Sequence, residues 1–92
     1  MIEQQVKITN RLGLHARAAA QLVRTASAYE SCLRLERDDG SASADAKSIL
    51  SVLLLAASCG TVLRATAEGG DEAEAMRALC ALVASGFGED QT

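Results

Sequence analysis

The stretch IEQQVKITNRLGLHARAAAQLVRTASA, residues 2–28, contains the change of hydrophobic period that decides the fold. Apolar and polar residues alternate over residues 2–9, as they do along a strand that buries one face. Over residues 16–28 the apolar side chains recur instead at helical spacing. The residues between these two segments, Asn10 to Gly13, are typical of a turn. The chain therefore begins with a strand, a turn and a helix.

The same two periods recur along the rest of the chain. Alternation predicts strands over residues 32–37, 41–44 and 61–67, the first two joined by a hairpin turn. Helical spacing predicts a second helix that begins near Ala46 and stops by Gly60, and a third whose first turn contains the acidic residues Asp71, Glu72 and Glu74. The order β-α-β-β-α-β-α predicts an α+β fold, with a four-stranded antiparallel sheet that carries three helices on one face.

Length and composition indicate one small domain. The 92 residues suffice for one modest core, which must be built from small aliphatic side chains because aromatic residues make up only 2%. We expect the domain to span residues 1–88, with a frayed end from Gly86 onward and a disordered tail over residues 89–92. No apolar run is long enough for a membrane span and no secretory signal is readable, so a cytoplasmic location is the default expectation.

Charge and cysteine content exclude two further classes of function. A formal net charge of −3, with no basic stripe, argues against a nucleic-acid partner. The cysteines Cys32, Cys59 and Cys80 are widely spaced, and they form no metal-ligand pattern with the single histidine. We therefore expect buried or half-buried free thiols, no metal and no cofactor.

The segment whose residues could take part in a reaction is GLHAR, residues 13–17. It places the single histidine between a turn and the start of a helix. Backbone N–H groups at a helix start have no partner within the helix and attract anions. An imidazole near neutrality offers an unprotonated nitrogen as a nucleophile. Arg17 could then pair with phosphate oxygens through its planar guanidinium group. The same residues also fit a histidine that merely caps the helix beside a solvated arginine.

Three segments of the chain resemble one known family. Residues 13–19, GLHARAA, are similar to the histidine signature of the HPr family, the phosphocarriers of the bacterial sugar phosphotransferase system. Residues 43–50, SADAKSIL, resemble the serine region of that family, and residues 60–69 resemble its last strand and turn. Because two separate motifs agree with the order of elements, the resemblance is specific and implies the open-faced β-sandwich of that family.

The resemblance implies a function and a set of partners. It makes His15 the residue that accepts a phosphoryl group from phosphoenolpyruvate through enzyme I, with Arg17 binding the phosphate. The group would pass to enzyme IIA-type acceptors, so the protein is expected to be a monomeric carrier rather than a stand-alone catalyst. Ser48 matches the regulatory serine, which an HPr kinase/phosphorylase modifies in some bacteria. Its alternative role is that of a polar residue in the first turn of a helix.

The chain departs from the family pattern around this site. Ala18 replaces the proline that usually follows the arginine, so we expect the helix to form while the loop becomes less fixed. Family members tend to carry several lysines here, whereas this chain keeps Arg24 and Lys47. We expect Ala18, Arg24 and Lys47 to contribute to a partner-binding surface that is less basic than usual.

The apolar run over residues 49–55 has more large side chains than one helical face can bury. We expect Ile49, Leu50 and Leu53 to remain exposed beside His15 and to contact partner proteins. The alternative is a thicker core.

Two other functions fit the residues less well. A paralogous regulatory module, acting on nitrogen or carbon metabolism mainly by docking on other proteins, is favoured by Ala18 and the thin basic surface. A small-molecule-binding domain would need a ligand pocket, and neither a glycine-rich phosphate loop nor a carboxylate pair supports one.

Overall fold

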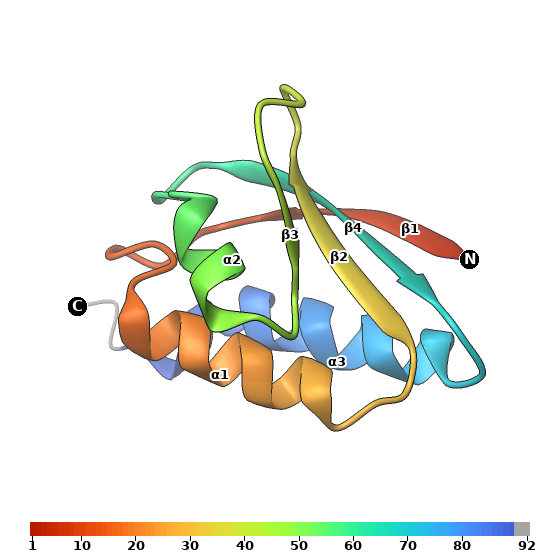
Figure 1. Cartoon of the computed structure of the whole chain (residues 1–92). Coiled ribbons are helices and arrows are strands. Elements are labelled where there is room, and N and C mark those ends of the chain that lie inside the picture. The colour runs from red at the N-terminus through yellow and green to blue at the C-terminus, as the bar shows by residue number, and fades with distance from the viewer. Residues whose placement is uncertain (90–92) are drawn as a thin grey trace.

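The computed structural model describes residues 1–89, which contain four strands, three α-helices and one 3-10 helix (Figure 1). In chain order these are β1 (Ile2–Lys7), α1 (Ala16–Ser27), β2 (Cys32–Arg37), β3 (Ser43–Asp45), α2 (Ile49–Leu54), β4 (Val62–Glu68), α3 (Glu72–Ala84) and η1 (Gly86–Gly88). The strands form one antiparallel sheet in the order β1-β4-β2-β3. This arrangement confirms the predicted fold class.

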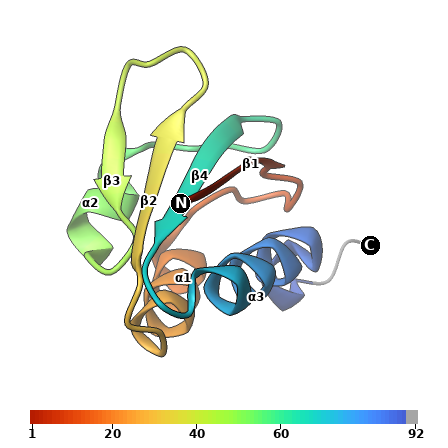
Figure 2. The same cartoon turned by 90° about the vertical axis from the view of Figure 1, so that its right-hand side faces the viewer.

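The helices cover one face of the sheet and leave the other open. Helices α1 and α3 lie side by side beneath the strands, while α2 packs against α1 and the edge strand β3 (Figures 1 and 2). Along β4, each residue that faces the helices is buried and its neighbours are half-exposed, as the period of two requires. The core is built mainly from Ile8, Leu22, Leu33, Leu35, Leu63 and Leu79, which are all fully buried. None of the helices within residues 1–89 is long and apolar enough to cross a membrane.

The second helix is much shorter than the segment from Ala46 to Gly60 that was expected. Before α2, the carboxylate of Asp45 accepts a hydrogen bond from Lys47 N at 2.9 Å, which makes a local turn instead of helix. Ser48 is the N-cap, and the helix is over by Ala56, whose φ of +52° lies in the left-handed region. The helical spacing is correct, but both predicted ends are wrong.

The end of the described chain is ordered, contrary to expectation. Beyond Gly86, η1 buries the Phe87 side chain in the core, with 3% of it exposed. The backbone N–H of Glu89 then donates to the carbonyl of Gly86 at 3.1 Å. The frayed end predicted from Gly86 is therefore wrong up to Glu89, and residues 90–92 lie outside the described residues.

The cysteines are free, but their burial was partly mispredicted. Cys80 is half-buried as expected, and burial raises the pKa of its thiol. Cys32 and Cys59 are exposed. Cys32 faces outward because the alternation of β2 turns its neighbours Leu33 and Leu35 toward the core.

Asp71 fastens the start of α3 to the turn that follows α1. Its carboxylate accepts hydrogen bonds from the backbone N–H groups of Glu30 at 2.9 Å and Ser31 at 3.0 Å, and from the Ser31 hydroxyl. These bonds, that of the Ser31 hydroxyl foremost, hold the pKa of Asp71 below its ordinary value. The two elements are therefore joined most firmly when this carboxyl group is ionised.

Candidate functional site

His15 immediately precedes α1. Its backbone is extended, with φ −72° and ψ 177°, and its carbonyl accepts the first helical hydrogen bond from Ala19 N at 2.8 Å. The imidazole makes no capping hydrogen bond, and 24% of the side chain is exposed. His15 is therefore the N-cap residue of α1, but its ring takes no part in the cap.

The loop before His15 is fixed by close backbone contacts. Leu14 N donates to the carbonyl of Ala57 at 2.8 Å, and His15 N donates to the carbonyl of Gly13 at 2.9 Å. Gly13 has a φ of +67°, and a Cβ at this position would lie 2.6 Å from the Ala57 carbonyl oxygen. Only glycine fits such an approach with this backbone. The loop is thus held against the segment that follows α2, even though Ala18 replaces the family proline.

The start of α1 is well suited to an anion. Because Ala19 donates the first bond of the helix, the N–H groups of residues 16–18 have no acceptor within it. The first turn of α1 contains no acidic residue, whereas that of α3 contains two. The Arg17 side chain is exposed and takes part in none of the ion pairs found within residues 1–89. A phosphoryl group beside His15 would meet these N–H groups and this guanidinium.

Glu89 is a third group at the site, and sequence reasoning missed it. Its carboxylate oxygen Oε2 lies 3.4 Å from Nε2 of His15 and accepts a hydrogen bond from Asn10 Nδ2 at 2.5 Å. Only 8% of the Glu89 side chain is exposed. The two residues are 74 positions apart in the sequence, so no local pattern could indicate the contact.

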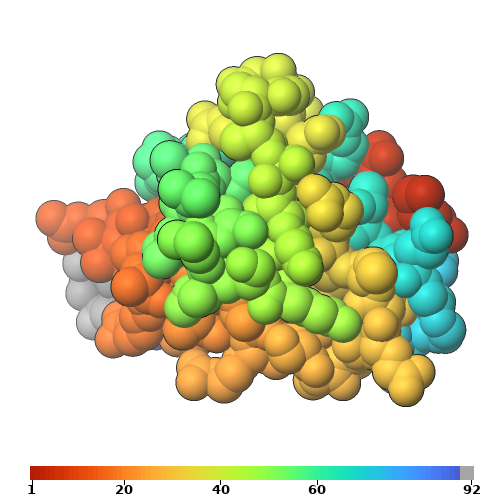
Figure 3. All heavy atoms as spheres, viewed as in Figure 1, coloured from red at the N-terminus to blue at the C-terminus, as the bar shows by residue number. Residues whose placement is uncertain are grey.

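The exposed side of α2 forms an apolar surface, which we call the α2 patch. It consists of Ile49, Leu50, Leu53 and Leu54, with 44%, 65%, 36% and 71% of their surface exposed. The predicted exposure of the first three is confirmed, and Leu54 was missed. Figure 3 shows the surface of α2, in green, beside the orange surface of α1 and the loop before it. That loop adds Leu12, which is 63% exposed.

Ser48 has a structural role at the start of α2. Its hydroxyl oxygen accepts a hydrogen bond from Ser51 N at 3.3 Å, and the residue is half-buried. A phosphoryl group on this oxygen would place negative charge next to the α2 patch. The N-cap hydrogen bond and the predicted phosphorylation would therefore involve the same oxygen atom.

The other predicted partner-binding residues are dispersed. Ala18 is fully buried and does not reach the surface, so its predicted contact with a partner is wrong: it lies on the core side of α1. Arg24 is exposed in the last turn of α1. Lys47 donates through Nζ to the carbonyl of Tyr29 at 2.8 Å, just beyond that helix. A helix of 12 residues is about 18 Å long, so both cations are remote from His15.

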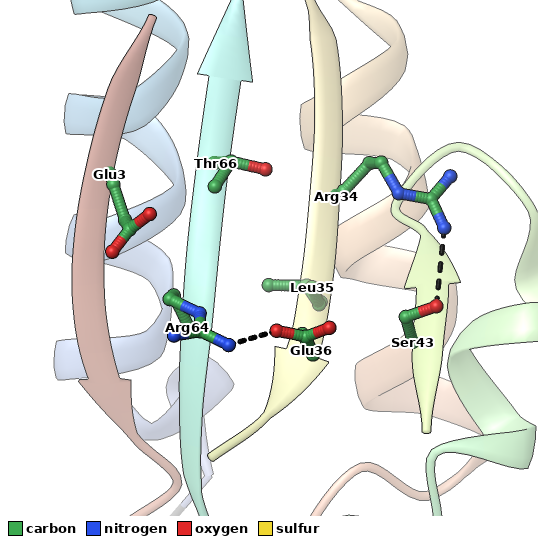
Figure 4. A pocket seen from close by; sticks show the side chains of 7 residues that line it. All are labelled: Glu3, Arg34, Leu35, Glu36, Ser43, Arg64 and Thr66. Atoms are coloured by element: carbon green, nitrogen blue, oxygen red, sulfur yellow. Dashed lines mark hydrogen bonds and ion pairs between the residues drawn. The ribbon is translucent and has the colours of Figure 1, made fainter. Parts of the chain in front are cut away.

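A surface hollow lies elsewhere, on the open face of the sheet (Figure 4). Its volume is about 420 Å³, and its floor carries an ion pair between Arg64 and Glu36. Beside this pair, Arg34 donates to the Ser43 hydroxyl at 3.3 Å. The hollow has no access to His15, because the sheet separates the two.

Comparison with known proteins identifies the family. A model of the PTS-HPr family, described as the PTS HPr component phosphorylation site, matches residues 2–85. The chain belongs to the PTS-HPr family. The phosphocarrier protein HPr of Xylella fastidiosa is 48% identical over 90 residues, which cover 98% of this chain and 99% of the relative. The phosphocarrier protein NPr of Escherichia coli K12 is 38% identical over 89 residues, which cover 97% and 98%.

Solved structures of PTS-HPr proteins share the fold. The crystal structure of HPr-C-His from Thermoanaerobacter tengcongensis matches with a TM-score of 0.91 at 44% identity, covering 98% of this chain and 99% of that chain. The phosphocarrier protein HPr from Bacillus anthracis matches with a TM-score of 0.83 at 35% identity, covering 89% and 95%. The family and the fold predicted from the sequence motifs are thus confirmed.

Proposed function

We propose that this protein is a phosphocarrier of the sugar phosphotransferase system, accepting a phosphoryl group from phosphoenolpyruvate through enzyme I and passing it to enzyme IIA-type acceptors. The observation that carries the proposal is the place of the single histidine, His15, at the N-terminal end of α1 beside the exposed Arg17. Similarity over nearly the whole chain to proteins named phosphocarrier protein HPr supports it. The family resemblance adds a cytoplasmic location and a monomeric carrier to the proposal.

The geometry favours Nδ1 of His15 as the accepting atom. The carboxylate of Glu89 lies 3.4 Å from Nε2, where a dianionic phosphoryl group would be repelled. In the transfer, the lone pair of Nδ1 forms a bond to phosphorus while the bond from phosphorus to the donor atom breaks and its electron pair stays on the donor. The proton on Nε2 stays in place, so no separate base is needed.

Arg17 and the helix N-terminus then have one shared task. The transferred group carries negative charge on its three oxygens, and that charge is spread further in the transition state. Donors that are already oriented toward the site stabilise it without further ordering. The N–H groups of residues 16–18 belong to the backbone of α1, and Arg17 can pair with two oxygens at once.

The α2 patch is the proposed contact for both enzyme I and the acceptors. An exposed cluster of four large apolar residues is costly to leave in water and is typical of a surface that a partner covers. It adjoins the loop that holds His15, so a partner seated on it has its own reactive group near the imidazole. Ser48, at the edge of the patch, is the proposed regulatory position.

The proposal is tested by incubating the protein with phosphoenolpyruvate and enzyme I and measuring its intact mass before and after mild acid. We expect the mass of one phosphoryl group to appear and then to be lost in acid, as phosphoramidates are. His15→Ala should remain unmodified, and Arg77→Ala, which changes an exposed cation on α3 outside the predicted site, should be modified normally. An acid-labile phosphate on the His15→Ala variant would refute the assignment.

A regulatory paralogue is the second candidate, and the similarity to NPr favours it. The identity to NPr, 38%, is lower than the 48% to HPr, so the sugar system is the first choice. The same assay separates them when enzyme I of the sugar system and its nitrogen-system counterpart are supplied in parallel. Faster phosphorylation by the counterpart would replace the first candidate by the second.

A further inference from the structure

Asn10 is a fully buried polar residue whose amide group faces the site. Its Nδ2 donates to the carbonyl of Gly13 at 2.7 Å and to Oε2 of Glu89 at 2.5 Å. Both partners are acceptors, so the amide can have only one orientation. In that orientation Oδ1 is buried without a partner within the described residues, which costs stability. The loop therefore retains an unfavourable buried oxygen together with a donor aimed at Glu89.

Glu89 is held at this place from its other side as well. Phe87 is inserted into the core, and Glu89 N donates to the carbonyl of Gly86, so the backbone that carries the glutamate is anchored. Among residues 1–89, the nearly buried carboxylate has hydrogen-bond contacts with a neutral amide, that of Asn10, and with the imidazole of His15 at 3.4 Å. Burying a carboxylate with so few hydrogen-bond donors costs folding free energy, unless an opposite charge lies beside it.

We propose that Glu89 is a positioning residue for phosphoryl transfer at His15, an inference that rests on the proposed function. Its carboxylate accepts a hydrogen bond from Nε2–H, which fixes the ring and its tautomer and leaves the lone pair on Nδ1. When Nδ1 bonds to phosphorus, the ring becomes positively charged, and the adjacent carboxylate stabilises that charge. The hydrogen bond from Asn10 holds the Glu89 carboxylate beside Nε2 of the His15 ring.

This role differs from a purely structural one in what it demands of residue 89. A glutamine at this position keeps the length of the side chain and an oxygen that can accept from Asn10 and from the ring. It lacks the negative charge. If the contact only fastened the end of the chain, Glu89→Gln would behave like the unmodified protein. If the charge assists transfer, this variant should fold normally and transfer slowly.

The first measurement needs no variant and uses the full chain. Nitrogen-15 spectra of the His15 ring at mildly alkaline pH identify which nitrogen of the neutral imidazole carries the proton. We expect the proton on Nε2. A neutral ring protonated on Nδ1 would overturn the proposal, whatever the behaviour of any variant.

The second measurement compares Glu89→Gln with Glu68→Gln, which removes the same charge from an exposed position at the end of β4. We expect phosphorylation by enzyme I to slow about tenfold for Glu89→Gln, the difference between a charged and a neutral hydrogen bond. The phosphorylated variant should also lose its phosphoryl group more slowly at mildly alkaline pH, because the neutral ring is a poorer leaving group. The Glu68→Gln protein should match the unmodified protein in both.

The two measurements keep this inference separate from the proposed function. Equal uptake rates and equal phosphoryl lifetimes for Glu89→Gln and Glu68→Gln would refute the role of Glu89, while His15 would remain the acceptor. Failure of the unmodified protein to gain an acid-labile phosphate would refute the proposed function itself. If Glu89→Gln melts at a lower temperature, the lifetime of the phosphoryl group on Glu89→Ala and the ring spectrum of the unmodified protein decide whether Glu89 assists transfer. Loss of packing alone would not lengthen that lifetime.

Discussion

Replacing Leu50 by glutamate tests whether the α2 patch is a docking surface. Leu50 is the second residue of α2, with 65% of its surface exposed. Burying a whole leucine side chain is worth about 1.5–3 kcal/mol, so a partner that covers the exposed part gains about 1–2 kcal/mol. Losing that gain weakens binding about fivefold to thirtyfold. The cost of desolvating the new carboxylate adds to this loss.

The same substitution should leave the free energy of unfolding almost unchanged. The buried third of Leu50 contributes about 0.5–1 kcal/mol. A carboxylate in the first turn of a helix recovers about 0.3–1 kcal/mol from the helix dipole, which offsets most of the loss. Glutamate in place of the fully buried Val52, two residues later, would instead cost several kcal/mol.

Ala73→Glu is the matched control for Leu50→Glu. Ala73 is also the second residue of its helix, α3, and is exposed, so the variant adds the same side chain at the same helical position outside the patch. Melting temperature and affinity for enzyme I are measured for both variants. Unfolding of Leu50→Glu would place Leu50 in the core, and normal melting with unchanged affinity would refute the docking role of the patch.

Four further substitutions follow from the same contacts. Arg17→Ala should change the free energy of unfolding by less than about 0.5 kcal/mol but slow phosphorylation by at least about tenfold, since charge-assisted hydrogen bonds to the phosphoryl group are lost. A loss of stability large enough to account for the slower phosphorylation would contradict this role. Ala18→Pro should leave the melting temperature nearly unchanged, because the N–H it removes has no acceptor in the first turn. Unfolding of this variant would mean that the buried position 18 cannot accommodate the pyrrolidine ring of proline. Ser48→Asp should keep the melting temperature, because aspartate is an equally good N-cap, and should weaken affinity for enzyme I by adding charge beside Leu50; unchanged affinity would count against regulation there. The pKa of Asp71 is lowered in the folded state, so its contribution to stability is present above about pH 4 and is lost as pH falls through the folded pKa. Denaturant midpoints should show that Asp71→Asn is less stable than the unmodified protein at neutral pH and equally stable in acid. A difference in stability that persists in acid would contradict the assignment.

The fold was predictable where each segment has one hydrophobic period along its whole length. The alternation before Asn10 is compatible only with a strand, and the spacing after His15 only with a helix. The structure has both elements at these places. The prediction failed between Ala46 and Ser48, which form a turn after β3 instead of the first turn of a helix. There Ala46 N donates to the carbonyl of Leu33 at 2.9 Å, a contact between segments that no local propensity contains.

The site was predictable to the extent that it is local. His15 and Arg17 share one turn with the helix start, and the spacing alone places them together. The direction of the Lys47 side chain and the approach of Glu89 depend on how elements pack, so no local pattern indicates either. The burial of Phe87 is what converts an apparently frayed end into part of the site.

The loop that carries His15 and the segment that leaves α2 are joined by a backbone hydrogen bond. Leu14 N donates to the carbonyl of Ala57, and Ala56 just before it has a backbone in the left-handed region, which costs a non-glycine residue about 1 kcal/mol. Such a conformation persists only where neighbours enforce it, and here Arg37 of β2 donates to the Ala56 carbonyl at 3.3 Å. The sheet thus holds the end of α2, and the end of α2 holds the loop. A partner that seats itself on the α2 patch therefore meets His15 at a fixed place, with no further ordering required before transfer.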